Sequence, residues 1–174
     1  DVLRLPGTEI LAVANGGIQT HPDTGRAKLN LATMQPNLTY LTTAGVIAQH
    51  HLDDAMRLNS IRHLAVREDG LVALAMQWQG PLDAVPPLLA LHGRGDPTLG
   101  LLAAPGREQR RTRGYAGSIA FSGDGGGVAI TAPRGGRAHL FDVETGVLRA
   151  SVERPDICGI AASFDGHLAT DGHG

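Results

Sequence analysis

The chain has 174 residues, which is enough for one domain with a substantial core. Hydrophobic residues make up 42% of it and aromatic residues only 3%, and its 24 glycines and 10 prolines favour short strands and turns over long helices. The net charge of −2 argues against a nucleic-acid binder, because neutralising phosphates needs a clear positive excess. A single cysteine excludes an intramolecular disulfide, and no apolar run approaches the roughly 20 residues of a membrane-spanning helix.

The predicted elements are short strands separated by turn clusters, and they recur in groups of four. The first group opens with a shortened strand before the turn Pro6-Gly7-Thr8. The later predicted strands are, in chain order, Glu9–Ala14, Asn37–Thr42, Val46–Leu52, Ser60–Val66, Leu71–Gln77, Pro87–Leu91, Leu99–Leu102, Ser118–Ser122, Val128–Ala132, Ala138–Val143, Val147–Val152, Cys158–Ser163 and His167–Thr170.

The most complete group lies between Tyr115 and Asp156. Turn clusters separate its four strands, which predicts an antiparallel meander, and Gly146 can supply the positive φ of a short hairpin. The strand Val128–Ala132 is nearly continuously apolar. That pattern is typical of a strand covered on both faces, as the inner strands of a propeller blade are.

We therefore predict an all-β fold, a β-propeller with about three and a half four-stranded antiparallel blades in one domain over residues 1–174. The blades fall approximately at residues 1–55, 59–104, 115–154 and 157–174. We expect a closed ring of about seven blades, within the range of known propellers. The chain begins at Asp1 without a methionine and stops within a blade, so we expect it to be a piece of a longer protein. Open blade edges predict self-association.

A candidate ligand site follows from propeller geometry. Loops between the second and third strands emerge on the same face as the blade-to-blade connections, around the central channel, and polar residues gathered there are the default place for a ligand. We expect Arg62 and Arg134 to orient an anionic or polar ligand. The candidate ligand-binding residues are Asn15, His21, Arg62, His63, Tyr115, Arg134, Asp156 and His173, and Gln77 and Gln79 lie on the same face.

Histidine and aspartate residues on this face could bind a transition metal, but no compact ligand motif is present. We favour structural histidines that line the channel, and we assign no catalytic residue and no cofactor beyond this open transition-metal alternative. His50-His51 with Asp53-Asp54 resembles a metal motif, yet it ends an edge strand and is expected to be solvated. Cys158 is expected to be a small buried thiol instead of a nucleophile.

Three other segments allow a functional and a structural interpretation. The loop Asn15–Met34 either lies over the channel or contacts a partner, or it is a packed insertion whose Asn15-Gly16-Gly17 supplies a positive φ. Gly123–Gly127 is expected to be a hairpin turn, because no helix follows that could hold a phosphate. Arg107–Arg113 is basic without interleaved aromatic residues, so a solvated loop is favoured over a nucleic-acid contact.

Several stretches resemble the bacterial family of domain-of-unknown-function proteins DUF1513. They are Val13-Ala14-Asn15-Gly16-Gly17-Ile18, His21-Pro22, Lys28-Leu29-Asn30-Leu31, Thr33-Met34, Pro36, residues 59–66, Tyr115, Gly117-Ser118, residues 131–135, Pro155-Asp156 and Cys158-Gly159. The resemblance covers essentially the whole chain and corresponds to the C-terminal half of family members. It implies a YVTN-type or WD-type propeller, twin-arginine export to the periplasm and an association with iron uptake, with no established activity.

The sequence thus predicts a non-catalytic periplasmic binding or scaffolding module whose partner is a periplasmic protein or a small polar ligand. The alternative is a metal-dependent propeller enzyme, a lactonase-like hydrolase or an oxidoreductase, with its site at the channel mouth. A purely structural partner of iron-uptake proteins is a third interpretation.

Overall fold

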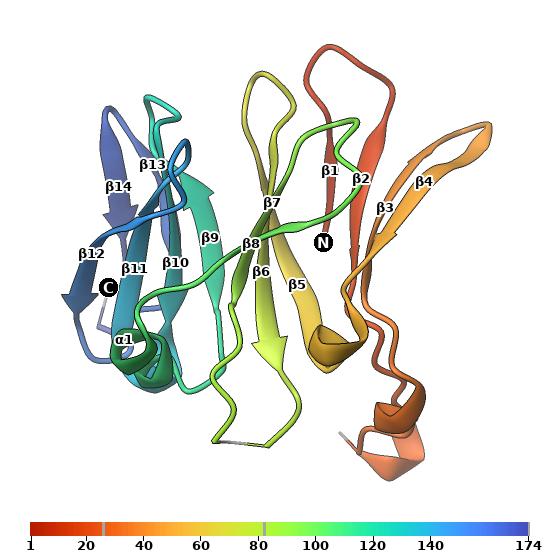
Figure 1. The fold of residues 1–174 in the computed structure, drawn as a ribbon, viewed down its shortest axis with the longest axis horizontal. Coiled ribbons are helices and arrows are strands. Elements are labelled where there is room, and N and C mark those ends of the chain that lie inside the picture. The colour runs from red at the N-terminus through yellow and green to blue at the C-terminus, as the bar shows by residue number, and fades with distance from the viewer. Residues whose placement is uncertain (26, 82, 174) are drawn as a thin grey trace.

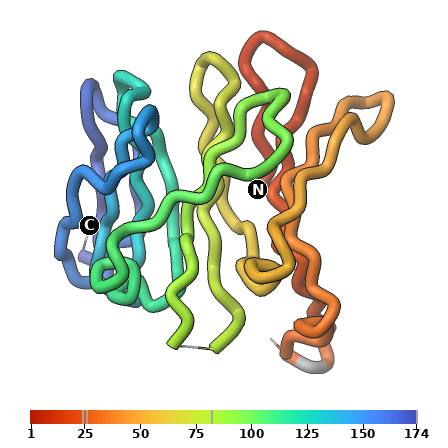
Figure 2. Tube along the Cα trace, viewed as in Figure 1, coloured from red at the N-terminus to blue at the C-terminus, as the bar shows by residue number. Residues whose placement is uncertain are grey.

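The chain folds as a partial β-propeller, which confirms the predicted all-β class (Figure 1). The structure is a computed structural model that describes residues 1–25, 27–81 and 83–173. Three four-stranded antiparallel sheets follow one another, and a two-stranded sheet comes after them. Figures 1 and 2 show these sheets standing side by side in chain order, with hairpin turns at one end and longer connections at the other.

Each sheet uses strands that are consecutive in the sequence. Blade 1 contains β1 (Val2–Arg4), β2 (Leu11–Asn15), β3 (Asn37–Thr42) and β4 (Gly45–His51). Blade 2 contains β5 (Asn59–Val66), β6 (Val72–Trp78), β7 (Leu89–His92) and β8 (Gly100–Leu102). Blade 3 contains β9 (Ser118–Phe121), β10 (Gly127–Ala132), β11 (Arg137–Asp142) and β12 (Leu148–Glu153), and the half-blade contains β13 (Ile160–Ser163) and β14 (Gly166–Ala169).

In the part of the chain that the structure describes, all helices are short and lie in the connections between strands. They are the 3-10 helices η1 (Pro22–Thr24), η2 (Leu31–Thr33), η3 (Asp54–Met56) and η4 (Pro133–Gly135) and the α-helix α1 (Gly106–Arg111). Within the described residues none of these helices has the length and apolar character needed to cross a bilayer.

Blade 2 supplies side chains to two hydrophobic clusters, because successive residues of a strand point to opposite faces. Val72, Leu74 and Met76 of β6 pack into the cluster shared with blade 1. Ala73 and Ala75 pack into the cluster shared with blade 3. All five residues are fully buried. Strand β6 is therefore covered on both faces, which explains why its residues Val72–Met76 are all apolar in sequence.

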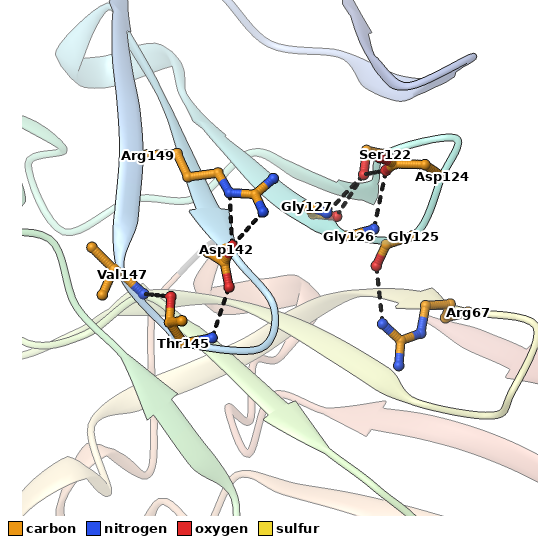
Figure 3. Close-up of polar contacts among 10 residues, drawn as sticks. All are labelled: Arg67, Ser122, Asp124, Gly125, Gly126, Gly127, Asp142, Thr145, Val147 and Arg149. Atoms are coloured by element: carbon orange, nitrogen blue, oxygen red, sulfur yellow. Dashed lines mark hydrogen bonds and ion pairs between the residues drawn. The ribbon is translucent and has the colours of Figure 1, made fainter.

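Aspartate side chains fix two hairpin turns of blade 3 at the end opposite the longer connections (Figure 3). Asp142 accepts hydrogen bonds from the Thr145 amide (2.7 Å) and from Nε of Arg149 (2.9 Å), which lower its pKa to about 2. Arg149 is the extra residue of a β-bulge between β11 and β12, and Ile47 has the same place between β3 and β4. Asp124 likewise accepts a hydrogen bond from the Gly126 amide (3.0 Å), so Gly123–Gly127 is the expected hairpin turn.

Arg67 joins two blades at this same end (Figure 3). Its guanidinium forms a bidentate pair with Asp69 in its own turn, and Nη1 donates to the carbonyl of Gly125 in blade 3 (2.9 Å). Charge-assisted, bidentate contacts of this kind are stronger and more directional than neutral ones. The pair with Asp69 therefore holds the Arg67 guanidinium in position for its hydrogen bond to Gly125 in blade 3.

The predicted loop Arg107–Arg113 contains an α-helix, which corrects that expectation. Gln109 in α1 is only 3% exposed. Its Oε1 accepts a hydrogen bond from the Ala104 amide (2.9 Å), and its Nε2 donates to the carbonyl of Pro86 (2.8 Å). These contacts to blade 2 hold a helix that is too short to be stable alone. The arginines of this run are exposed, as expected.

Candidate functional site

The longer connections lie together at one end of the propeller, the lower end in Figure 1. A pocket of about 600 Å³ opens there, and we call it the mouth pocket. Residues from the β2–β3 loop, from β5 and β6, and from the connections around β9 and β10 line it. They are Ile18, Thr20, Lys28, Arg62, His63, Gln77, Trp78, Gln79, Tyr115 and Arg134. Blades 1, 2 and 3 therefore all contribute to one site.

Arg134 is presented by η4 and packs on an aromatic ring. Its Cζ lies 4.2 Å from the centroid of the Tyr115 ring, within cation–π distance. Tyr115 is itself held against blade 2, because its neighbour Gly114 accepts a hydrogen bond from the Trp78 amide (2.8 Å) and the residue forms a bridge with Gln77. The cationic group of blade 3 thus rests on a ring that is anchored to blade 2.

Arg62 reaches the pocket from a β-bulge in β5. The pairing register shifts between Ile61 and His63, so Arg62 is the extra residue opposite β6. Bulges redirect side chains and are common next to functional sites. The Nε atom of Arg62 is buried and has no hydrogen-bond partner among the described residues. A buried donor without a partner is costly, so an acceptor near Nε of Arg62 would be favourable here.

The pocket is electropositive. Lys28, Arg62 and Arg134 line it, and none of its described lining residues is acidic. Neither arginine forms an ion pair with a described carboxylate. His63 lies 3.3 Å from the Asp1 carboxylate, and its burial, with a further contribution from Arg62, lowers its pKa and favours the neutral imidazole. Such a lining attracts anionic groups and repels cationic ones.

The long loop between β2 and β3 forms one wall of the pocket. Asn30 organises it: its Oδ1 accepts a hydrogen bond from the Gln19 amide (2.7 Å) and its Nδ2 donates to the carbonyl of Gly17 (2.8 Å). Gly17 has the positive φ of +70° that was expected in this turn. Ser60 fastens the loop to blade 2 by donating to the carbonyl of Gly16 (2.8 Å). The loop is thus packed against blade 2, as expected of an insertion, and it also borders the mouth pocket, as expected of a functional loop.

Replacing Asn30 with alanine should loosen this wall without unfolding the protein. Two hydrogen bonds are lost, each contributing about 1 kcal/mol at most in such an exposed loop. We expect faster amide hydrogen exchange at Gln19 and Leu29, measured by NMR. Leu29→Ala is the matched control, because that side chain is exposed in the same loop. Equal exchange rates in the two variants would contradict the role of Asn30.

One family matches this chain. Its members are described as Protein of unknown function (DUF1513), and the match spans residues 1–174. The chain belongs to DUF1513. This membership confirms the family expected from the sequence, while the correspondence to the C-terminal half of its members stays a prediction. No curated protein matches the chain.

The DUF1513 structure brings four of the eight candidate residues together, namely Arg62, His63, Tyr115 and Arg134. Asn15 lies on the neighbouring part of the same face, where its Nδ2 donates to Asn37 Oδ1 (2.8 Å) and Thr39 Oγ1 (3.0 Å) within blade 1. His21 precedes η1, where its Nδ1 accepts a hydrogen bond from the Asp23 amide (3.3 Å), and its side chain is 59% exposed. Asn15 therefore joins neighbouring strands of blade 1 through side chains, and His21 supports the local backbone.

The remaining two candidates belong to the half-blade end of the DUF1513 chain. Asp156 has a positive φ of 55° and is exposed before β13. His173 is exposed, and its backbone amide donates to Asp171 Oδ1 (2.8 Å). Neither lines the mouth pocket. The pocket residues Ile18, Thr20, Lys28 and Trp78 were not among the candidates, because no pattern in the sequence distinguishes them from other loop and core residues.

The expectation that His50-His51 with Asp53-Asp54 is solvated holds for His51, Asp53 and Asp54, which are exposed. His50 is half-buried, and its ring lies 4.1 Å from that of the fully buried His92, whose Nδ1 is 2.8 Å from the hydroxyl of Tyr40. The expectation for the cysteine is wrong. Cys158 is exposed instead of buried, and its carbonyl accepts a hydrogen bond from Oγ1 of Thr131. Among the residues that the structure describes, no three His, Cys, Asp or Glu side chains are grouped so that they could hold a metal ion.

Proposed function

We propose that this protein is a binding or scaffolding module that holds a small anionic ligand in the mouth pocket. The observation that carries the proposal is the buried Nε of Arg62, which has no partner among the described residues. Burying part of a guanidinium without an anion is unfavourable unless the free energy is recovered elsewhere. A bound carboxylate or phosphoryl group would supply the missing acceptor.

The surroundings of Arg62 support an anion over a neutral ligand. Lys28 comes from blade 1, Arg62 from blade 2 and Arg134 from blade 3, so three blades each direct one cation to the same pocket. Guanidinium groups match the planar oxygen pairs of carboxylates and phosphates. Cation–π packing on Tyr115 restricts the Arg134 head group before the ligand arrives.

The cellular context is proposed from the family resemblance alone. We propose that the protein acts in the periplasm after twin-arginine export, with a periplasmic protein of iron uptake as its partner. Fractionation of cells carrying the full-length protein tests the location, and co-purification from periplasm tests the partner. Recovery in the cytoplasmic fraction would exclude both.

Arg134→Gln should weaken anion binding about tenfold, because one charge-assisted contact is lost. The side chain is exposed, so the unfolding midpoint should not change. Isothermal titration with acetate and with succinate at constant ionic strength measures the effect. Arg107→Gln is the matched control: it removes the same charge from exposed α1, outside the pocket. If neither anion binds the unmodified protein, or if both variants bind alike, the proposed function is wrong.

A further inference from the structure

The geometry points to a ligand with two anionic groups, one held by Arg134 and the other by Arg62, so that a single small organic dianion bridges blades 2 and 3. This inference rests on the proposed function and specifies the class of ligand. The two arginines come from different blades and are anchored independently. Arg134 rests on Tyr115, and Arg62 projects from the bulge in β5.

Each guanidinium has its own set of donors available for one anionic group. A ring face is in contact with Arg134, which leaves its N–H groups to bind in the guanidinium plane. The buried Nε–H donor of Arg62 has no acceptor among the described residues. Two carboxylate or phosphoryl groups would pair with both arginines, whereas a single small anion would pair with one and leave the other to solvent.

The size and lining of the pocket indicate an organic molecule instead of an inorganic ion. A volume of about 600 Å³ lies within the usual range for small-molecule sites, and is many times the roughly 30 Å³ that one water molecule occupies. Ile18 and Trp78 add apolar surface that a carbon skeleton can contact. The ligand would place this skeleton between its two charged ends.

The amide side chains in the pocket are already oriented by the protein. Nε2 of Gln77 donates to the carbonyl of Ala116 (3.1 Å), and Nε2 of Gln79 donates to the carbonyl of Gln77 (2.7 Å). Each amide nitrogen therefore uses one of its two N–H donors, so one N–H donor and the side-chain oxygen of each glutamine remain for a ligand.

Matched acids test the inference on the whole chain. Linear dicarboxylates from malonate to adipate are titrated by calorimetry at constant ionic strength, each beside the monocarboxylate of equal chain length, such as succinate beside butyrate. The best diacid should bind at least about tenfold more tightly than its monoacid, because a second charge-assisted contact forms. Arg62→Gln and Arg134→Gln should each reduce this ratio to a few-fold, while Arg107→Gln should preserve it.

The outcomes separate the inference from the proposed function. If monoacids bind as tightly as their diacids, and Arg134→Gln weakens both equally, an anion site exists but the two-anion ligand is wrong. Inorganic phosphate that binds as tightly as the best diacid would overturn the inference as well. If no acid binds, both ideas fail. Should Arg62→Gln fail to fold, the exposed Arg134 variant alone still decides whether diacid selectivity depends on the pocket.

Discussion

Gly135→Ala is expected to destabilise the protein by about 3 kcal/mol, the upper part of the usual range for overpacking a tight contact. A Cβ at this position would lie 1.8 Å from the carbonyl oxygen of Arg111 and 2.9 Å from its carbonyl carbon. Both atoms belong to the backbone, so no side-chain rotation can relieve the clash. The turn η4 would have to move away from α1, and Arg134 would move with it. Anion binding should therefore fall together with stability.

Gly106→Ala is the matched control for this prediction. Gly106 begins α1, and nothing lies within 4 Å of its ideal Cβ. Because alanine favours a helix over glycine by up to about 1 kcal/mol, this variant should be as stable as the parent or slightly more stable. Urea unfolding followed by circular dichroism compares the two variants. Equal destabilisation would show that the close approach of η4 to α1 is not the cause.

The protein should lose stability as the pH falls below about 6.5, the ordinary pKa of histidine. His139 is 1% exposed, and neither ring nitrogen has a hydrogen-bond partner among the described residues. Burial lowers its pKa; nearby Arg137 lowers it further, while Glu108, 4.0 Å away, opposes the shift. Since its folded pKa lies below the unfolded one, the unfolded state binds the proton first. The stabilisation is thus complete above about pH 6.5 and is lost on acidification.

Each buried histidine with a lowered pKa can change the free energy of unfolding by up to about 1.4 kcal/mol per pH unit. We expect His139→Gln to flatten the dependence of the free energy of unfolding on pH, measured by urea denaturation between about pH 7.5 and about pH 5. His92 is a second fully buried histidine whose pKa is lowered by burial. His92→Gln should flatten the curve independently, since it lies in another blade. An unchanged slope in both variants would contradict the assignment.

Most of the fold could be predicted because its signals are local. Turns such as Thr145-Gly146 mark where strands must reverse, and Gly146 has the positive φ of +68° that its hairpin requires. The strand Asn37–Thr42 was placed with its observed bounds. The helix α1 was missed because it depends on contacts of Gln109 with distant residues of blade 2. A run of six residues is too short to show helical periodicity.

The candidate site could be predicted only in part. Topology indicates on which face of the propeller a residue lies, but not how far that residue lies from the propeller axis. Arg62 lies within β5 and Arg134 directly after β10, and both line the mouth pocket. His21 shares their face, but it lies in a long loop whose path is set by Asn30. No sequence pattern indicates where such a loop folds back. The bulge that redirects Arg62 is likewise a property of pairing register, which the sequence of β5 alone does not contain.

Strand β6 contributes to both hydrophobic clusters, and this determines which strands can separate first from the native structure. Outer strands such as β4 and β12 pair on one edge only and can fray while both hydrophobic clusters persist. Opening β6 removes side chains from both clusters at once, so it coincides with global unfolding. We therefore expect solvent to reach the backbone amides of β6 only when the neighbouring blades have separated.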